Sequence, residues 1–363
     1  MVRVILDVMG GDYAPKAALE GALEALPDLT KPHSELVLLG DEKVIRSHLA
    51  QRKFRRLAEN SSVRIVHAPQ NIDMEDSIRA IRSKPEATIN VGCRLAGKSF
   101  SEHDAIPTAF VSAGHSGAVM ASALLNMGRL RNVERPPIAV RLPTLSPDGC
   151  VMLDVGANVD CKPEHLRDFA VMGSIFAQTE RKSSGLPKVG ILSNGEERKK
   201  GNELTRAALE LIEKLPCFQD GPHAAGRLIG YVEGKEIFKG QVDVVVCDGF
   251  VGNVVLKSLE GLGSAVVRNL KQEAKASPIT ALGFLLAAPA FRRLKRKLDY
   301  AEYGAAPLLG VAGYAFICHG RSNPKAMKNA LLRAHAATES RFVEKMEAAL
   351  ASTHNVPPNE ASV

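Results

Sequence analysis

The feature that most constrains the fold of this 363-residue chain is a unit that occurs five times along it. Each unit has a short run of β-branched residues, a loop rich in Gly, Asp and Asn, and an amphipathic segment with helical spacing. The units occupy residues 2–26, 109–130, 150–178, 188–215 and 242–263. Strands that alternate with helices are typical of α/β proteins, in which right-handed crossovers connect parallel strands. The sequence therefore predicts a doubly wound, mostly parallel α/β sheet.

The loops of the five units are expected to line one cleft. In an open α/β sheet, ligands bind outside the carboxyl ends of the strands, where the following loops come together. These loops supply backbone amides, polar side chains and a few cations, which suit binding a small anion and stabilising an oxyanion. The candidate substrate-binding residues of the first four loops are Asp7, Gly10, Gly11, Asp12, Gly114, His115, Ser116, Gly117, Asp154, Asn158 and Gly195.

The fifth unit carries the strongest indication of an anion site. Residues 242–246 are predicted to form a buried strand, and a helix is expected to start near Asn253. The unpaired amides and the dipole of a helix N-terminus attract anions, and Lys257 lies one turn inside this helix. A phosphate is the predicted ligand. The turn between strand and helix, which belongs to the same candidate site, contains Asp248, Gly249 and Gly252.

Four polar side chains near these loops have both a functional and a structural interpretation. Lys199 and Lys200 follow Gly195 in a charged loop and either point at an anion or are ordinary surface charge. His115 and His319 either donate protons to a substrate, or bind phosphate, or are structural. Both interpretations stay open for each residue.

No metal, cofactor or covalent nucleophile is predicted. Asp7, Asp154 and Asp248 end successive strands and could hold Mg²⁺, but turn and helix-capping roles are favoured. The six cysteines have no CxxC pair and no zinc spacing. Residues 92–99 match the pattern of a nucleotide phosphate loop, but no strand precedes them, so a helix is predicted there.

Charge and composition favour anionic partners other than nucleic acid. The net charge is +7, but only 5% of residues are aromatic and Trp is absent, so surfaces that stack on bases are poorly supplied. The N-terminal run is too short and too charged for a signal peptide, and no apolar run is expected to reach bilayer-spanning length. Unpaired cysteines agree with a reducing compartment. The sequence predicts a cytoplasmic protein.

Residues 264–302 are predicted to form an apolar and basic helical hairpin that contacts a membrane. The run PITALGFLLAAPAF is apolar nearly all round, and RRLKRKLDY follows it with five clustered cations. This composition is typical of helices that lie in a membrane interface, and each cation contributes about 1 kcal/mol at an anionic surface. A buried core hairpin is the alternative. The candidate membrane-contact residues are Leu282, Phe284, Leu285, Leu286, Phe291, Arg292, Arg293, Lys295, Arg296 and Lys297.

The C-terminal part of the chain is predicted to close with one long helix. Its pattern extends from about residue 324 to residue 349. The last residues, 352–363, are polar and contain two adjacent prolines, and they are predicted to be disordered.

Seven runs of the chain are distinctive when taken together. They are LDVMGGDYAP, VSAGHSGAVMASAL, LDVGANVDCKPEHL, GEERKKGNEL, VDVVVCDGFVGNVVLKSLEG, YGAAPLLG and HGRSN, in this order from residue 6 to residue 323. In this order they resemble the bacterial phosphate acyltransferases, which make acyl phosphate from acyl-acyl carrier protein. Any single run would be weak evidence, but seven in register are specific. The resemblance implies a three-layer α/β/α fold similar to phosphotransacetylases and isopropylmalate dehydrogenases.

The resemblance also implies an activity and partners. Inorganic phosphate would attack the thioester of fatty acyl-acyl carrier protein, and the acyl phosphate would pass to a membrane glycerol-3-phosphate acyltransferase for phospholipid synthesis. A homodimer, peripheral association with the inner face of the cell membrane and a single two-lobed catalytic domain over 1–351 are implied as well. On this basis the catalytic candidates are Lys200, Asn253, Lys257 and His319.

Two alternative functions stay open at this point. One is a phosphotransacetylase-like enzyme of the same fold that acts on acyl-coenzyme A. The other is a non-catalytic membrane scaffold that only recruits enzymes of lipid synthesis.

Overall fold

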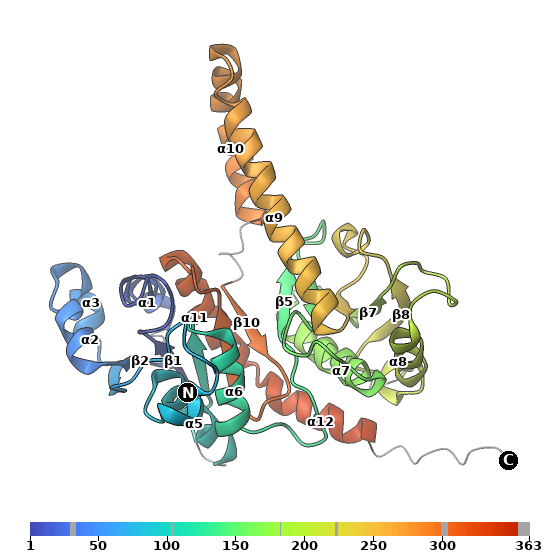
Figure 1. The fold of residues 1–363 in the computed structure, drawn as a ribbon, viewed down its shortest axis with the longest axis horizontal. Coiled ribbons are helices and arrows are strands. Elements are labelled where there is room, and N and C mark those ends of the chain that lie inside the picture. Colours follow the sequence, from blue (N-terminus) through green and yellow to red (C-terminus); the bar gives the residue numbers. More distant parts are fainter. Residues whose placement is uncertain (30–33, 103–104, 182, 222–223, 299–303, 355–363) are drawn as a thin grey trace.

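Two mostly parallel sheets, rather than one continuous sheet, form the protein (Figure 1). The computed structural model describes residues 1–29, 34–102, 105–181, 183–221, 224–298 and 304–354, apart from the side chains of 294–298 and 352–354. The first sheet has the order β10-β11-β4-β1-β2-β3, and only β10 is antiparallel to its neighbour. Its strands are β1 (Val2–Asp7), β2 (Ser34–Gly40), β3 (Val63–His67), β4 (Thr108–Ser112), β10 (Ala305–Leu308) and β11 (Tyr314–Cys318).

The second sheet has the order β5-β6-β9-β7-β8, and β5 alone is antiparallel to its neighbour. Its strands are β5 (Ala139–Leu142), β6 (Cys150–Leu153), β7 (Lys188–Leu192), β8 (Arg227–Val232) and β9 (Val244–Val246). The two sheets meet at their antiparallel edges, where Ile138 forms a bridge with Leu308 and Leu309 N donates to Pro137 O (2.9 Å). Each sheet with its helices is one lobe of the molecule.

Helices cover both faces of each sheet, which produces three layers in each lobe. In the first lobe, Leu6 packs in the same core as α1 and α11, whereas Ile5 packs in the core of the opposite face with α5 and α6. This alternation follows from the two-residue period of a strand. The helices of this lobe are α1 (Lys16–Leu29), α2 (Glu42–Leu49), α3 (Arg55–Ala58), α4 (Ala80–Ser83), α5 (Thr88–Ser101), α6 (Ser116–Asn126) and α11 (Pro324–Glu339). Short 3₁₀ segments occur as well. One, η1 (Arg52–Phe54), is in this lobe, and two, η2 (Pro216–Phe218) and η3 (Ile237–Lys239), are in the second.

In the second lobe, α7 (Pro163–Glu180) covers one face of the sheet together with α8 (Glu203–Glu213). The start of α9 (Gly249–Glu273) packs against the opposite face through Val255, Leu256 and Leu259. Helix α12 (Phe342–His354) crosses from the first lobe and packs on α7, where the Phe176 and Phe342 rings are 5.3 Å apart. One apolar core therefore extends through both lobes.

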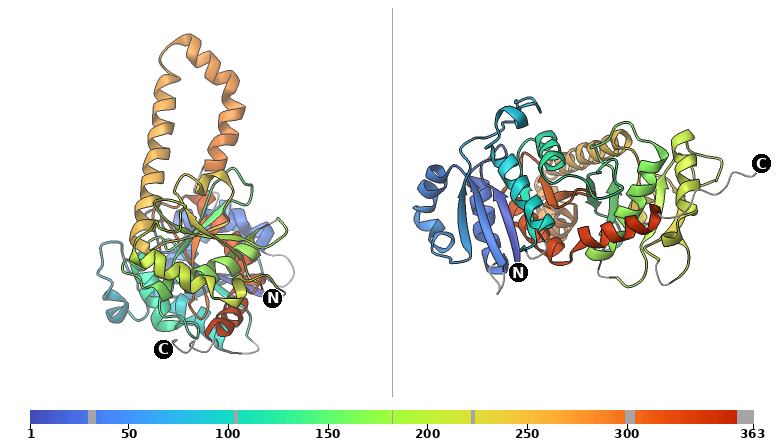
Figure 2. Two further views of the ribbon diagram at one scale, coloured as in Figure 1. Left: turned by 90° about the vertical axis from the view of Figure 1, so that its right-hand side faces the viewer. Right: turned by 90° about the horizontal axis from the view of Figure 1, so that it is seen from below.

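Beyond the sheet, α9 continues outward and returns as α10 (Pro278–Leu298), so that the two helices form a hairpin that projects from the body (Figures 1 and 2). With 25 residues and a mean hydropathy of 1.3 in its most apolar window, α9 is long and apolar enough to cross a membrane. The expectation that no apolar run reaches bilayer-spanning length is therefore wrong. Only 6% of that window is buried.

The structure confirms one predicted helix and divides another. Residues 92–99 lie inside α5, so the helix predicted in place of a phosphate loop is confirmed. The single helix predicted for residues 324–349 is wrong, because Arg341 has a positive φ of 52° and divides it into α11 and α12. Helix α12 also continues through residues 352–354, which were predicted to be disordered, and the rest of that prediction lies outside the described residues.

Candidate active site

The candidate loop after β1 is built around the buried carboxylate of Asp7. Ser112, the last residue of β4, donates from Oγ to Asp7 Oδ2 (2.7 Å) and accepts from Gly114 N (3.0 Å). Met9 N donates to Asp7 Oδ1 (3.1 Å). Burial raises the pKa of Asp7, and the hydrogen bond from Ser112 opposes that rise. A methyl group on Gly10 would lie 2.7 Å from Asp7 Oδ2, so the loops after β1 and β4 pack closely around this carboxylate.

The loop after β11 joins these two loops. Asp12 N donates to Gly320 O (2.8 Å), and Arg321 Nε lies 3.8 Å from Asp12 Oδ2. His319 begins this third loop, and its Nδ1 accepts a hydrogen bond from Arg321 N (3.1 Å). The structure thus brings His319 and Asp12 to the same edge of the first sheet.

Helix α6 presents a donor-rich N-terminus at this edge. His115 caps the helix, because its Nδ1 accepts from Ala118 N (3.2 Å). A ring nitrogen that accepts carries no proton, which leaves the proton of the neutral ring on Nε2. Within the described residues, no hydrogen-bond partner is recorded for the amides of Ser116 and Gly117. Two amides and a ring N–H are therefore available to an anion at this position.

The corresponding loop of the second lobe is built around Asp154. Its carboxylate accepts five hydrogen bonds, from the amides of Ile138 (3.0 Å), Gly156 (3.2 Å), Ala157 (3.1 Å) and Asn158 (2.6 Å) and from Asn158 Nδ2 (2.9 Å). Burial raises the pKa of Asp154, and these donors oppose the rise. Asp154 thus holds the 154–158 loop in shape.

Helix α9 starts directly on this loop. Gly249 N donates to Asn158 O (2.8 Å), and a methyl group on Gly252 would overlap the carbonyl oxygen of Asp154. Asn253 follows on the exposed side, and its side chain lies close beside Gly156. The two glycines therefore permit a contact that places Asn253 at the mouth of the loop.

The N-terminus of α9 uses most of its own amides. Gly249 N is bonded to Asn158 O, and Val251 N (2.9 Å) and Gly252 N (3.0 Å) donate to the Asp248 cap. In the first turn this leaves Phe250 N as the amide with no partner recorded among the described residues. An anion at this helix therefore depends on side-chain donors, with Asn253 the nearest.

The two candidate lysines differ in their surroundings. Lys257 Nζ forms an exposed ion pair with Glu260 on the same helix (2.8 Å). The stem of Lys200 covers Gly195, and within the described residues no ion pair is recorded for its ammonium group. Lys200 is thus the candidate cation without a carboxylate to neutralise it.

The three aspartates that end strands each have a structural partner. Asp7 joins the loops of the first lobe, Asp154 shapes a loop of the second, and Asp248 caps α9. Among the described residues, no group of three or more His, Cys, Asp or Glu side chains is placed to hold a metal ion.

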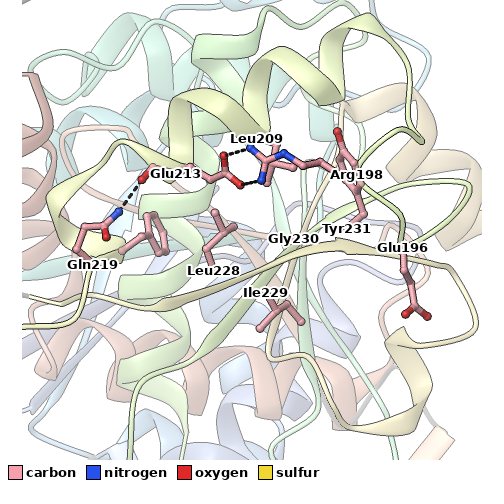
Figure 3. Close-up of a pocket in the computed structure, with 10 residues that line it drawn as sticks. Glu196, Arg198, Leu209, Glu213, Gln219, Leu228, Ile229, Gly230 and Tyr231 are labelled. Carbon is pink, nitrogen blue, oxygen red and sulfur yellow. Dashed lines mark hydrogen bonds and ion pairs between the residues drawn. The ribbon is translucent and has the colours of Figure 1, made fainter. Parts of the chain in front are cut away.

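A cavity of about 410 Å³ lies against edge strand β8, where the fourth loop borders it through Glu196 and Arg198 (Figure 3). Its Arg198 forms two hydrogen bonds with Glu213 (2.9 and 2.7 Å), so the two charges neutralise each other. None of the candidate residues of the first, second, third or fifth loop lines it. The lining residues are Glu196, Arg198, Leu209, Glu213, Phe218, Gln219, Leu228, Ile229, Gly230 and Tyr231.

Sequence reasoning missed two contributors to the site. Ser112 connects Asp7 with Gly114, and the signal was a polar residue at the end of an apolar strand. The segment before α4 places Ile78 against Gly117 and Met74 against Gly320, and no sequence pattern indicated that contact.

Comparisons with known proteins agree with this architecture. A family model described as "Fatty acid synthesis protein" matches residues 2–345. A phosphate acyltransferase from a Nitratiruptor species is 44% identical over 347 residues, which cover 96% of this chain and 97% of the relative. One from a Geobacter species is 46% identical over 335 residues, which cover 92% and 88%.

Solved structures share the fold at low sequence identity. The EutD phosphotransacetylase from Staphylococcus aureus is 15% identical, with a TM-score of 0.56 and 93% of each chain covered. A phosphotransacetylase from Streptococcus pyogenes is 16% identical, with a TM-score of 0.55 and 93% and 94% covered. The predicted α/β/α fold is confirmed by these likenesses and by the layered sheets. Its match to the family model and its identity to these relatives over nearly its whole length show that the chain belongs to the phosphate acyltransferase family.

Proposed function

We propose that this protein catalyses the attack of inorganic phosphate on the thioester of a fatty acyl-acyl carrier protein. A phosphate oxygen bonds to the carbonyl carbon, the carbon–sulfur bond breaks, and the sulfur leaves as thiolate and takes a proton. The products are acyl phosphate and free carrier protein. The observation that carries the proposal is the membership of the phosphate acyltransferase family over nearly the whole chain.

The cysteines support phosphate, rather than an enzyme thiol, as the nucleophile. Burial raises the pKa of Cys318 to about 12 and that of Cys217 to about 11, and it raises the pKa of Cys247 well above its ordinary value. A thiol must ionise before it attacks, so these groups are inert near neutral pH. These three thiols are thus poor nucleophiles, which supports inorganic phosphate as the attacking group.

The loops would bind the phosphate and stabilise the oxyanion. Asn253 and Lys200 supply donors from the second lobe, and the amides of Ser116 and Gly117 supply donors from the first. Preorganised donors aimed at a developing oxyanion are a large source of catalysis. His319 is a weaker candidate, and Lys257 would have to leave its exposed ion pair with Glu260 to reach the phosphate. A thiol with a pKa near ~8.5 is a tolerable leaving group without a strong general acid.

The proposed partners follow from charge and from the hairpin. A net charge of +7 suits an acidic carrier protein, and the exposed apolar hairpin suits an anionic membrane surface. We propose a cytoplasmic homodimer that binds the membrane peripherally and passes its product to a membrane glycerol-3-phosphate acyltransferase. The side chains of Lys295, Arg296 and Lys297, which belong to this proposal, lie outside the described residues.

A direct test compares two acyl donors in one preparation. Hexadecanoyl-carrier protein and hexadecanoyl-coenzyme A are assayed in parallel for thiol release with and without phosphate. We expect phosphate-dependent release with a preference for the carrier protein. A strong preference for coenzyme A would favour a phosphotransacetylase-like enzyme. No thiol release from either donor would contradict both enzymatic functions and favour a non-catalytic membrane scaffold.

The same assay tests the site. Asn253→Ala should abolish phosphate-dependent release while the protein stays folded, because it removes the side-chain donor beside Gly156. Asn269→Ala is the matched control, since Asn269 is an exposed residue of the same helix on the hairpin. Full activity in folded Asn253→Ala would remove Asn253 from the site.

A further inference from the structure

Two large apolar side chains stand half-exposed beside the loops of the first lobe. Met74 is 49% exposed and Ile78 is 48% exposed, and both precede α4. Tyr13, which follows the loop after β1, is 54% exposed. Exposed apolar side chains are ordinary when they are scattered, but these two lie in one short segment at the candidate active site. We call Met74 and Ile78 the apolar rim.

The apolar rim touches two of the loops that would bind the substrate. Ile78 packs on Gly117, where a methyl group would lie 3.0 Å from Ile78 Cδ1. Met74 packs on Gly320, where a methyl group would lie 3.4 Å from Met74 Cε. The rim thus extends from the N-terminus of α6, with its available amides, to the loop that begins at His319.

Polar bonds hold the rim in place. Lys84 Nζ donates to Asn71 O (3.0 Å) and to Asp76 Oδ2 (2.6 Å), which ties together the two ends of the segment. Asn90 Nδ2 donates to the carbonyl oxygens of Ile81 (2.8 Å) and Lys84 (2.9 Å) from within α5. The segment is therefore preorganised, and its two apolar side chains are held half-exposed at the edge of the site.

We infer that Met74 and Ile78 bind the alkyl chain of the acyl substrate and so contribute to its chain-length preference. The inference rests on the proposed function. In that reaction the long alkyl chain is attached to the reacting thioester, so it has to be removed from water close to the site. Each methylene that leaves water favours binding, so a fatty acyl chain needs apolar surface within reach of the loops. The cavity at β8 is bordered by the fourth loop, through Glu196 and Arg198, and by none of the first-lobe loops that hold the available amides.

Polar substitutions of similar shape test the inference. Met74→Gln and Ile78→Asn, combined in one protein, keep the rim close to its size but make it polar, and both sites are exposed enough to tolerate the change. The control is Leu145→Gln. Leu145 is 85% exposed and lies between β5 and β6, at the amino end of β6 in the second lobe, whereas the apolar rim belongs to the first lobe. Thiol release is measured with hexadecanoyl- and butanoyl-carrier protein at saturating phosphate, together with the KM for phosphate.

We expect the double variant to lose about tenfold in kcat/KM for the hexadecanoyl substrate relative to the butanoyl substrate. The KM for phosphate and all values for Leu145→Gln should stay unchanged. An equal loss for both chain lengths would overturn the inference, because the rim would then act on the carrier or on the loops. No loss for either would place the chain elsewhere. If the unmodified protein releases no carrier from either substrate, the proposed function itself fails, and this inference fails with it.

Discussion

Gly252 determines where the catalytic candidates of the second lobe stand. Any side chain at this position would overlap the carbonyl oxygen of Asp154, so only glycine lets α9 rest on the 154–158 loop. Asn253 is the next residue, and it lies beside Gly156 because of that contact. The position of one donor therefore depends on the absence of a Cβ atom at its neighbour.

The variant Gly252→Ala should separate α9 from the loop. We expect a loss of about 2 to 3 kcal/mol in the free energy of unfolding, the usual cost of overpacking a tight contact, and a large loss of turnover. Gly261→Ala is the control on the same helix, where a methyl group meets no atom within 4 Å. It should gain about 0.5 to 1 kcal/mol from helix propensity and keep its turnover. Urea unfolding and thiol release measure both quantities, and a Gly252→Ala protein equal to Gly261→Ala would refute the contact.

At the scale of residues, the sequence predicted the positions of the strand-end aspartates and the turn and capping roles of Asp154 and Asp248. The carboxylates of Asp7 and Asp154 were expected at the ends of strands, and the structure has them there. The hydrogen bonds that Ser112 donates to Asp7 and Ile138 donates to Asp154 could not be predicted from spacing. Both donors come from distant parts of the chain.

At the scale of elements, α9 connects the candidate active site with the hairpin. Its first turn rests on the 154–158 loop, and its later turns leave the body with apolar side chains in solvent. Leu262 is 62% exposed, Leu285 is 70% exposed and Leu286 is 76% exposed. Burying such side chains is worth about 1.5 to 3 kcal/mol each, so the hairpin is expected to be covered by a membrane or by a second copy.

Vesicle flotation tests the membrane part of that expectation. The intact protein should float with vesicles that contain anionic lipid, and high salt should weaken the binding because cations contribute to it. Leu285→Glu with Leu286→Glu should release the protein while turnover on soluble substrate persists, and Leu145→Glu should float normally. An intact protein that stays at the bottom of the gradient would remove the membrane proposal.

Element boundaries were predictable where local chemistry determines them. The glycine-rich loops indicated where strands end, and the structure agrees. The break between α11 and α12 was not predictable, because the left-handed residue is an arginine rather than a glycine. Tertiary packing determines this break: Phe342 turns inward against Phe176 and Tyr314.

At the scale of the whole molecule, two similar lobes join at the antiparallel edges of their sheets. In each lobe a Leu-Asp-Val sequence lies at the carboxyl end of a parallel strand, its aspartate is buried, and a glycine contacts the next loop. Arg333 of α11 joins the lobes by donating twice to Glu180 at the end of α7 (2.9 and 2.6 Å). Both side chains are nearly buried, so this pair is screened little by salt.

The division into two sheets was the part of the fold that the sequence could not supply. Strands of both sheets have the same β-branched pattern, and β10 and β11 rejoin the first sheet only after the whole second lobe and the hairpin. Pairing over such a separation depends on the assembled core rather than on local propensity. The fold class and the loops that carry the candidate site were readable because each depends on short-range patterns.

The proposed function requires that inorganic phosphate itself attacks the acyl thioester. Phosphorus-31 NMR of the unmodified protein with acyl-carrier protein and phosphate tests it most directly. We predict an acyl phosphate resonance that grows at the rate of thiol release, with both rates saturating as phosphate increases. Thiol release at the same rate without phosphate, with free fatty acid as the product, would contradict it.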